Sequence, residues 1–105
     1  PFSVITADLG DMAVDAVRSL GDKLKDKNSS VVAVFAIHSA QKLNFIAVCG
    51  KDAVANGAHA GNILREVSAV TGGKGGGRPD SAMSGGKDIS KIADALALVI
   101  TLLSK

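Results

Sequence analysis

The fold of this chain is decided by seven consecutive apolar residues, Val31-Val32-Ala33-Val34-Phe35-Ala36-Ile37. Four of the seven are β-branched, and the run is too short for a buried helix. Such a run is typical of a strand that is buried on both faces in the middle of a sheet. A loop over residues 38–42 and a second apolar run over residues 43–49 predict an antiparallel return strand, so the two runs form a hairpin.

One strand and one amphipathic helix are expected before this hairpin. Residues 2–9 alternate loosely between polar and apolar side chains, which is typical of a strand, and Gly10 ends it. Asp11 can cap a helix that ends near Lys27. The apolar face of that helix is predicted to consist of Ala13, Val17, Leu20 and Leu24.

Two further helices are expected after the hairpin. The first covers residues 53–70, where Gly57 and Gly61 weaken it by about 1 kcal/mol each if they are interior. Their missing side chains would let a neighbouring backbone approach closely. The second helix is capped by Asp88, and its apolar stripe consists of Ile89, Ile92, Leu96, Val99, Ile100 and Leu103.

The order of these elements predicts the fold class. The order is strand, helix, strand, strand, helix, glycine loop, helix, and a short strand within residues 80–84 is a further option. A helix joins the first two strands, which makes them parallel with a right-handed crossover, whereas a hairpin joins the second and third. The sequence therefore predicts a single α/β domain with a small mixed sheet packed by helices.

Glycine is concentrated in one segment of the chain. Seven of the 12 glycines fall between Gly72 and Gly86, and residues 72–91 hold four basic side chains against two acidic ones in a chain of net charge +2. Glycine backbones can turn several amides toward one anion, and flanking cations would add to the attraction. The candidate anion-binding residues are Gly72, Gly73, Lys74, Gly75, Gly76, Gly77, Arg78, Asp80, Lys87 and Lys91.

Two nucleotide-binding motifs do not match this segment. A P-loop requires Ser or Thr after its Lys, but Gly75 follows Lys74 and Asp88 follows Lys87. A dinucleotide fingerprint lies between a strand and a helix, whereas this segment follows a helix. The alternative interpretation is a long connector whose glycines only permit tight turns.

The remaining candidate sites are weak. The possible metal ligands His38, His59 and Cys49 have no spacing typical of a metal site. Cys49 is the only cysteine, so it cannot form an intrachain disulfide, and this fits a reducing compartment. It is expected to be a buried, inert thiol. Lys23, Lys25 and Lys27 alternate with acidic residues, which favours a solvated helix face over phosphate contacts. No apolar run reaches the roughly 18 residues that a membrane span needs, so no membrane partner is expected.

The glycine segment also carries a family resemblance. Three stretches resemble the C-terminal domain of alanyl-tRNA synthetases. They are Gly-Gly-Lys-Gly-Gly-Gly-Arg-Pro-Asp at 72–80, Gly-Gly-Lys-Asp at 85–88, and a helix that begins Ser90-Lys91 and continues into Ala95-Leu96. That domain belongs to the DHH-associated type 1 family, and the resemblance covers nearly the whole chain. Family members usually continue with Met-Ala-Gln-Ala where this chain has Ser-Ala-Met-Ser at 81–84.

The resemblance implies a function without catalysis. The family domain binds the outer corner (elbow) of the tRNA, where the D- and TΨC-loops meet, and helps to bring the aminoacylation and editing domains onto one tRNA. Residues 1–105 would then be one domain of a larger synthetase, and the start at Pro1 fits a fragment. The implied partners are tRNA(Ala) and the rest of the synthetase chain, and the apolar last helix offers a homodimer surface. No cofactor is expected in this domain, because the ATP and zinc of the parent enzyme would bind elsewhere.

Two alternatives remain open at this point. DHH-type phosphoesterases use the same kind of domain to hold substrate, but their glycine run is normally followed by His, where this chain has Arg78 and Pro79. A purely structural or dimerisation domain is the other alternative. The expected location is the cytoplasm, with an organelle as the alternative.

Overall fold

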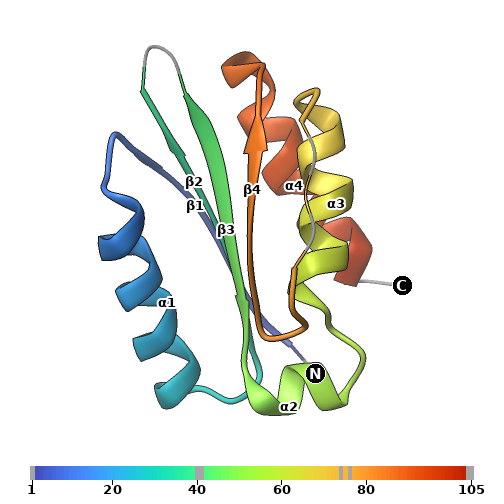
Figure 1. The fold of residues 1–105 in the computed structure, drawn as a ribbon. Coiled ribbons are helices and arrows are strands. Elements are labelled where there is room, and N and C mark those ends of the chain that lie inside the picture. The colour runs from blue at the N-terminus through green and yellow to red at the C-terminus, as the bar shows by residue number, and fades with distance from the viewer. Residues whose placement is uncertain (1, 40–41, 74, 76, 104–105) are drawn as a thin grey trace.

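The computed structural model describes residues 2–39, 42–73, 75 and 77–103. These residues form a four-stranded sheet with the strand order β1-β2-β3-β4 and helices on both of its faces (Figure 1). The elements are β1 (Ser3–Gly10), α1 (Val14–Lys27), β2 (Val31–His38), β3 (Leu43–Cys49), α2 (Lys51–Ala55), α3 (Ala60–Val70), β4 (Ser81–Gly86), the 3₁₀ turn η1 (Ile89–Lys91) and α4 (Ile92–Leu103).

The apolar run at 31–37 forms the central strand β2, and every residue of the run is buried. β2 pairs in parallel with β1 and antiparallel with β3, and Val32 lies opposite Cys49. β4 then pairs antiparallel with β3. The predicted mixed sheet, the parallel first pair and the hairpin are therefore confirmed, as is the short strand near residues 80–84.

The side chains of β2 alternate between two helical layers, as a period of two requires. Val31, Ala33, Phe35 and Ile37 pack with Val17 of α1. The other set packs with α3 and α4 on the opposite face of the sheet (Figure 1). Because both faces are covered, the strand contains no polar residue before its last position, and this explains the unbroken apolar run.

Helix α1 differs from its prediction in two details. It begins at Val14, and its N-cap residue Ala13 makes no side-chain cap hydrogen bond, so the expected capping by Asp11 is wrong. Leu20 is 38% exposed, and the contact with the sheet is made by Gly21, where a Cβ would lie 2.8 Å from a methyl group of Val48. Because the helix lies so close to the sheet, this position requires a glycine. Apolar periodicity does not identify it, since glycine is not scored as an apolar core residue.

The helix predicted over residues 53–70 is in fact two helices. α2 ends at Ala55 and α3 begins at Ala60. Between them Gly57 has a φ of +104°, a conformation that a helix cannot contain. His59 then caps α3 by accepting a hydrogen bond from the Asn62 amide at its Nδ1, 3.0 Å away. Gly57 therefore lies in the turn that separates the two helices and is not a weak position inside one helix.

The last helix agrees with its prediction except at one residue. Asp88 accepts a hydrogen bond from the Ser90 amide at 3.0 Å, and it caps the short turn η1, which leads directly into α4. Ile92, Leu96 and Val99 are buried, whereas Ile100 is 54% exposed. α4 has 12 residues, and no helix in the described part of the chain is long and apolar enough to cross a bilayer.

Replacement of Gly57 by alanine tests whether the turn between α2 and α3 requires the positive φ of a glycine. Gly57→Ala is expected to lower the free energy of unfolding by about 1–2 kcal/mol, because an L-residue at this positive φ is strained. A Cβ at Gly57 would meet no atom within 4 Å, so steric overlap adds nothing. Chemical denaturation of wild type and variant measures the loss.

The matched control is Gly85→Ala. Gly85 has no positive φ, and its Cβ would meet only the Leu43 carbonyl, at an ordinary 3.8 Å. This variant is expected to stay within about 0.5 kcal/mol of wild type. Equal stabilities of the two variants would contradict the role assigned to Gly57.

Candidate functional site

The glycine segment, residues 72–80, returns along α3 and lies between that helix and β4 (Figure 1). Each described glycine at this contact faces another backbone or a small side chain. A Cβ on Gly73 would overlap the Gly85 backbone, one on Gly75 would lie 2.7 Å from the Leu64 carbonyl, and one on Gly61 would overlap the Gly77 backbone. The backbone approach predicted for Gly61 is thus confirmed.

The first part of the segment caps the C-terminus of α3. Gly72 has a φ of +76°, its amide donates to the Ala69 carbonyl at 3.2 Å, and the Gly73 amide donates to the Ser68 carbonyl at 2.8 Å. These two bonds form a Schellman motif, which satisfies the last carbonyls of the helix. The amides of Gly72 and Gly73 are therefore engaged within the chain and do not point to an external anion.

The last part of the segment caps the N-terminus of the same helix. The Ala60 amide donates to the Pro79 carbonyl at 2.9 Å, and the Gly61 amide donates to the Arg78 carbonyl at 3.2 Å. The Cys49 amide donates to the Asp80 carbonyl at 2.9 Å, which ties the segment to the end of β3 as well. The segment is thus a packed structural element, and its glycines are needed for contact as well as for turning.

The structure divides the sequence-predicted site residues between the two ends of α3. At its C-terminal end, the amides of Lys87 and Asp88 both donate to the Thr71 carbonyl, and Lys91 follows in η1. At its N-terminal end lie Arg78 and Asp80. Eleven helical residues, about 16 Å, separate the two ends. Lys74 and Gly76 lie outside the described residues.

Arg78 belongs to a small ionic network at the N-terminal end of α3. Its side chain is 77% exposed, and its Nε donates to Asp80 Oδ1 at 3.5 Å. Asp80 Oδ2 lies 3.8 Å from Nζ of Lys25 in α1, and that Nζ lies 3.6 Å from Asp22 Oδ1. The hydrogen bond from Arg78 lowers the pKa of the Asp80 carboxyl, so Asp80 stays ionised at neutral pH.

Lys25 joins this ionic network from a helix face that the sequence pattern predicts to be solvated. The alternation of lysines with Asp22 and Asp26 favoured a solvated helix face, yet the Lys25 side chain is only 22% exposed. Its partner Asp80 is 55 positions away in the chain, so no local pattern could have revealed the pair.

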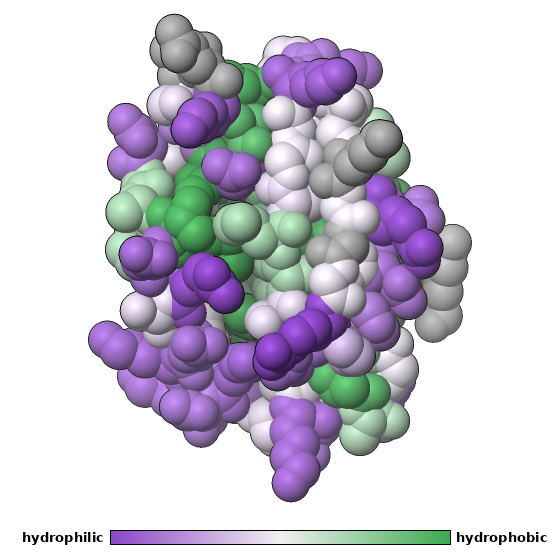
Figure 2. Space-filling model, in the orientation of Figure 1, coloured by the Kyte–Doolittle hydropathy of each residue, from purple (hydrophilic) through white to green (hydrophobic). Residues whose placement is uncertain are grey.

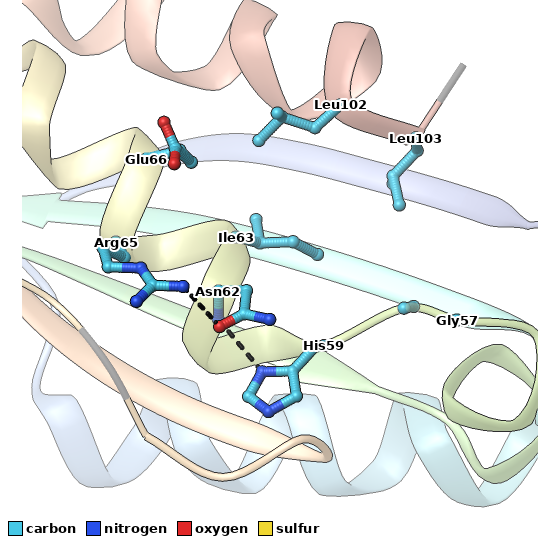
Figure 3. Close-up of a pocket in the computed structure, with 9 residues that line it drawn as sticks. Gly57, His59, Asn62, Ile63, Arg65, Glu66, Leu102 and Leu103 are labelled. Carbon is cyan, nitrogen blue, oxygen red and sulfur yellow. Dashed lines mark hydrogen bonds between the residues drawn. The ribbon is translucent and has the colours of Figure 1, made fainter. Parts of the chain in front are cut away.

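A second polar group lies on α3 beside the segment (Figure 3). Arg65 Nη2 donates to Asn62 Oδ1 at 2.8 Å, and the Asn62 amide donates to His59. These residues line a cavity of about 230 Å³ whose other wall includes Leu102 and Leu103. Arg65 is four positions after Gly61 and therefore lies on the helix face that borders the glycine segment. No local pattern in the sequence distinguishes Arg65, apart from its charge.

The surface along β4 carries mostly small side chains, with Met83, which is 48% exposed, as the exception among the described residues. Figure 2 shows this region as a pale stripe with hydrophilic residues below it and along its right side. β4 itself reads Ser-Ala-Met-Ser-Gly-Gly. Its Ser84 hydroxyl is buried and has no hydrogen-bond partner among the described residues.

The other chemical candidates are confined to the core or to capping roles. Cys49 is fully buried at the end of β3, and burial raises the pKa of its thiol to about 12, as an inert cysteine requires. His59 is occupied as a helix cap, and His38 Nε2 lies 3.0 Å from Asp8 Oδ1. Within the described ranges, no group of three His, Cys, Asp or Glu side chains could hold a metal ion.

Comparison with known proteins gives one consistent result. The family model of the DHHA1 domain matches residues 2–105. Alanine–tRNA ligase of Alkaliphilus oremlandii is 44% identical over 102 residues, covering 97% of this chain and 12% of that protein, and the ligase of Shouchella clausii is 46% identical over 97 residues, covering 92% and 11%. This chain therefore spans only about a ninth of the length of these relatives.

A solved structure matches in three dimensions. The crystal structure of the C-Ala domain from Aquifex aeolicus alanyl-tRNA synthetase superposes with a TM-score of 0.90 at 30% sequence identity. The match covers 99% of this chain and 93% of that chain.

The raised pKa of Cys49 predicts a specific pH dependence of stability. The unfolded thiol ionises near its ordinary pKa of 9.0, whereas the folded thiol holds its proton up to about pH 12. Between these values the folded state binds one more proton than the unfolded state, so stability falls as pH rises, by about 1.4 kcal/mol per pH unit. Stability below pH 9 is unaffected by this group.

The comparison protein is Cys49→Ala, which lacks the thiol. Denaturant unfolding at pH 7 and pH 10 is expected to show wild type losing about 1 kcal/mol more than the variant. The lysines titrate in both proteins and cancel in this difference. An equal loss in the two proteins would contradict the buried, neutral thiol.

Gly61→Ala tests the contact between α3 and the glycine segment. The new Cβ would overlap the Gly77 backbone, so the segment must move, and the free energy of unfolding is expected to fall by about 1–3 kcal/mol. Alanine favours helix by at most about 1 kcal/mol, which offsets only part of this cost. Glu66→Ala, at an exposed position of the same helix, is the control and is expected to be nearly neutral. A Gly61→Ala protein as stable as this control would show that the segment does not depend on the contact.

Proposed function

The chain belongs to the DHHA1 domain family and has the fold of the C-Ala domain of an alanyl-tRNA synthetase, and on that premise we propose that it is a tRNA-binding domain that performs no chemistry itself. The proposed ligand is tRNA(Ala), engaged at its elbow. By holding this part of the tRNA, the domain would help the aminoacylation and editing domains of the parent chain to act on one molecule. ATP and zinc would bind elsewhere in that parent.

The observation that carries this proposal is the structural match over nearly the whole of both chains, at a TM-score of 0.90. The relatives described above are named alanine–tRNA ligases, which favours the synthetase over the phosphoesterase module. The domain also offers surface features that RNA binding requires. Basic side chains stand at both ends of α3, and phosphate contacts supply most of the affinity of such interfaces.

In the proposed interface, the main role of the glycine segment is to hold its flanking side chains in place. Its amides at residues 72 and 73 are engaged with α3, so the proposed RNA contacts at that end come from side chains. Asp80 accepts from Nε of Arg78, which leaves the two terminal nitrogens of the guanidinium for a phosphate. Lys87 and Lys91 would contact phosphates at the other end of α3, and Lys74 is proposed with them.

Arg78→Ala tests the proposed interface. We expect the affinity for tRNA(Ala) to fall about three- to tenfold, and the slope of log affinity against log salt to become shallower by about one, because one phosphate contact is lost. Titration of labelled tRNA with the 105-residue chain, repeated at several salt concentrations, measures both quantities. An unchanged affinity and slope would remove Arg78 from the interface.

Two controls separate the possible outcomes. Lys42→Ala removes one positive charge near the hairpin and is expected to leave the affinity within twofold. A minihelix that contains the acceptor stem but no D-loop is expected to bind more weakly than whole tRNA, because it lacks the elbow. No binding of the wild-type chain to any RNA would favour the structural or dimerisation alternative.

A further inference from the structure

Three cations from three different elements meet where β3 ends. Lys25 comes from the last turns of α1, Lys51 is the first residue of α2, and Arg78 comes from the glycine segment. Gly50 joins β3 to α2, and the Asp80 carbonyl accepts from the Cys49 amide at the same place. The tertiary fold alone brings these three side chains to one end of the sheet.

A hollow of about 390 Å³ lies at this junction. Lys25 and Lys51 line it together with Asp26 and Asp80, and its apolar residues are Cys49 and Val54. Asp80 is the link to Arg78, since one carboxylate oxygen lies 3.5 Å from Arg78 Nε and the other lies 3.8 Å from Lys25 Nζ. Both oxygens of Asp80 are thus already occupied by cations of the chain.

The ionic balance of the hollow leaves a cation without a partner. Among the described residues, Lys51 has no carboxylate within 4.0 Å, whereas Lys25 is shared between Asp22 and Asp80. Asp26 also lines the hollow and forms no ion pair with a described residue. An anion in the hollow would therefore be attracted by Lys51, Lys25 and Arg78. It would be opposed by Asp26 and by Asp80, whose carboxylate also lines the hollow but already pairs with Lys25 and Arg78.

We propose that this hollow binds one phosphate group of the RNA backbone. Lys25, Lys51 and Arg78 would contact the phosphate together, and the Asp80 carboxylate would position Lys25 and Arg78. This inference rests on the proposed function and extends the interface beyond the glycine segment to α1 and α2. A backbone phosphate carries one negative charge and could accept hydrogen bonds from the unpaired Lys51, while Lys25 and Arg78 are already oriented by the Asp80 carboxylate.

The opposing carboxylate makes the proposal unusually testable, because one variant should weaken binding and another should strengthen it. At about 0.15 M salt, where charges beyond about 8 Å are largely screened, Lys51→Ala is expected to weaken tRNA binding about three- to fivefold and to make the salt slope shallower by about one. Asp26→Asn is expected to strengthen binding two- to threefold. Lys51→Arg keeps the charge and is expected to retain the affinity.

The matched control is again Lys42→Ala. Lys42 precedes β3 and Lys51 follows it, so the seven-residue strand, about 23 Å long, separates them. Both residues are exposed, and far-UV circular dichroism checks that each variant is folded. A loss with Lys51→Ala that exceeds the loss with Lys42→Ala, together with a gain for Asp26→Asn, supports the site.

The failure of this inference is distinguishable from the failure of the proposed function. If Arg78→Ala weakens binding while Lys51→Ala and Asp26→Asn stay within twofold of wild type, the hollow is not a phosphate site but the interface stands. If the wild-type chain binds no RNA, both the interface and the hollow are overturned.

Discussion

The close packing of the glycine segment against two backbones is the constraint on which the rest of this end of the molecule depends. Gly61 and Gly77 meet without side chains between them, and Gly73 meets the backbone of β4 in the same way. Because no Cβ intervenes, the segment can bond with both ends of α3, through the Gly73 amide at one end and the carbonyls of Arg78 and Pro79 at the other. The segment thus satisfies two amides at the N-terminal end of α3 and two carbonyls at its C-terminal end, groups that have no partner within the helix.

This arrangement also fixes where the charged side chains lie. The turn that follows Gly77 places Arg78 and Asp80 beside the N-terminus of α3 and the end of β3, while Lys87 is held near Thr71 at the opposite end. Asp80 then becomes a bridge between the segment and α1, because its carboxylate reaches both Arg78 and Lys25. The segment therefore fixes the positions of its flanking charged side chains, while its amides at residues 72 and 73 bond within the chain.

Local sequence patterns were reliable where local chemistry decides structure. The apolar run at 31–37 could only be a strand with both faces buried, and the Asp88 cap needs nothing beyond its own turn. The local patterns failed at residues whose burial or backbone conformation depends on a neighbouring element. Leu20 has the period of a core residue, but α1 lies so close to Val48 that Gly21 makes the contact instead. Gly57 looked like a weak helical residue because its positive φ cannot be read from composition.

The sequence by itself determined the α/β class, the strand pairing of the first three strands and the family resemblance, since apolar periodicity and a glycine-rich motif are properties of short stretches. Only the tertiary structure decided which cations lie at the same end of the sheet. Lys25, Lys51 and Arg78 are separated along the chain by 26 and 27 positions, and they meet because α1, α2 and the glycine segment all converge on the end of β3. Electrostatic partnership depends on distance in space, and the packing of helices on a sheet sets that distance.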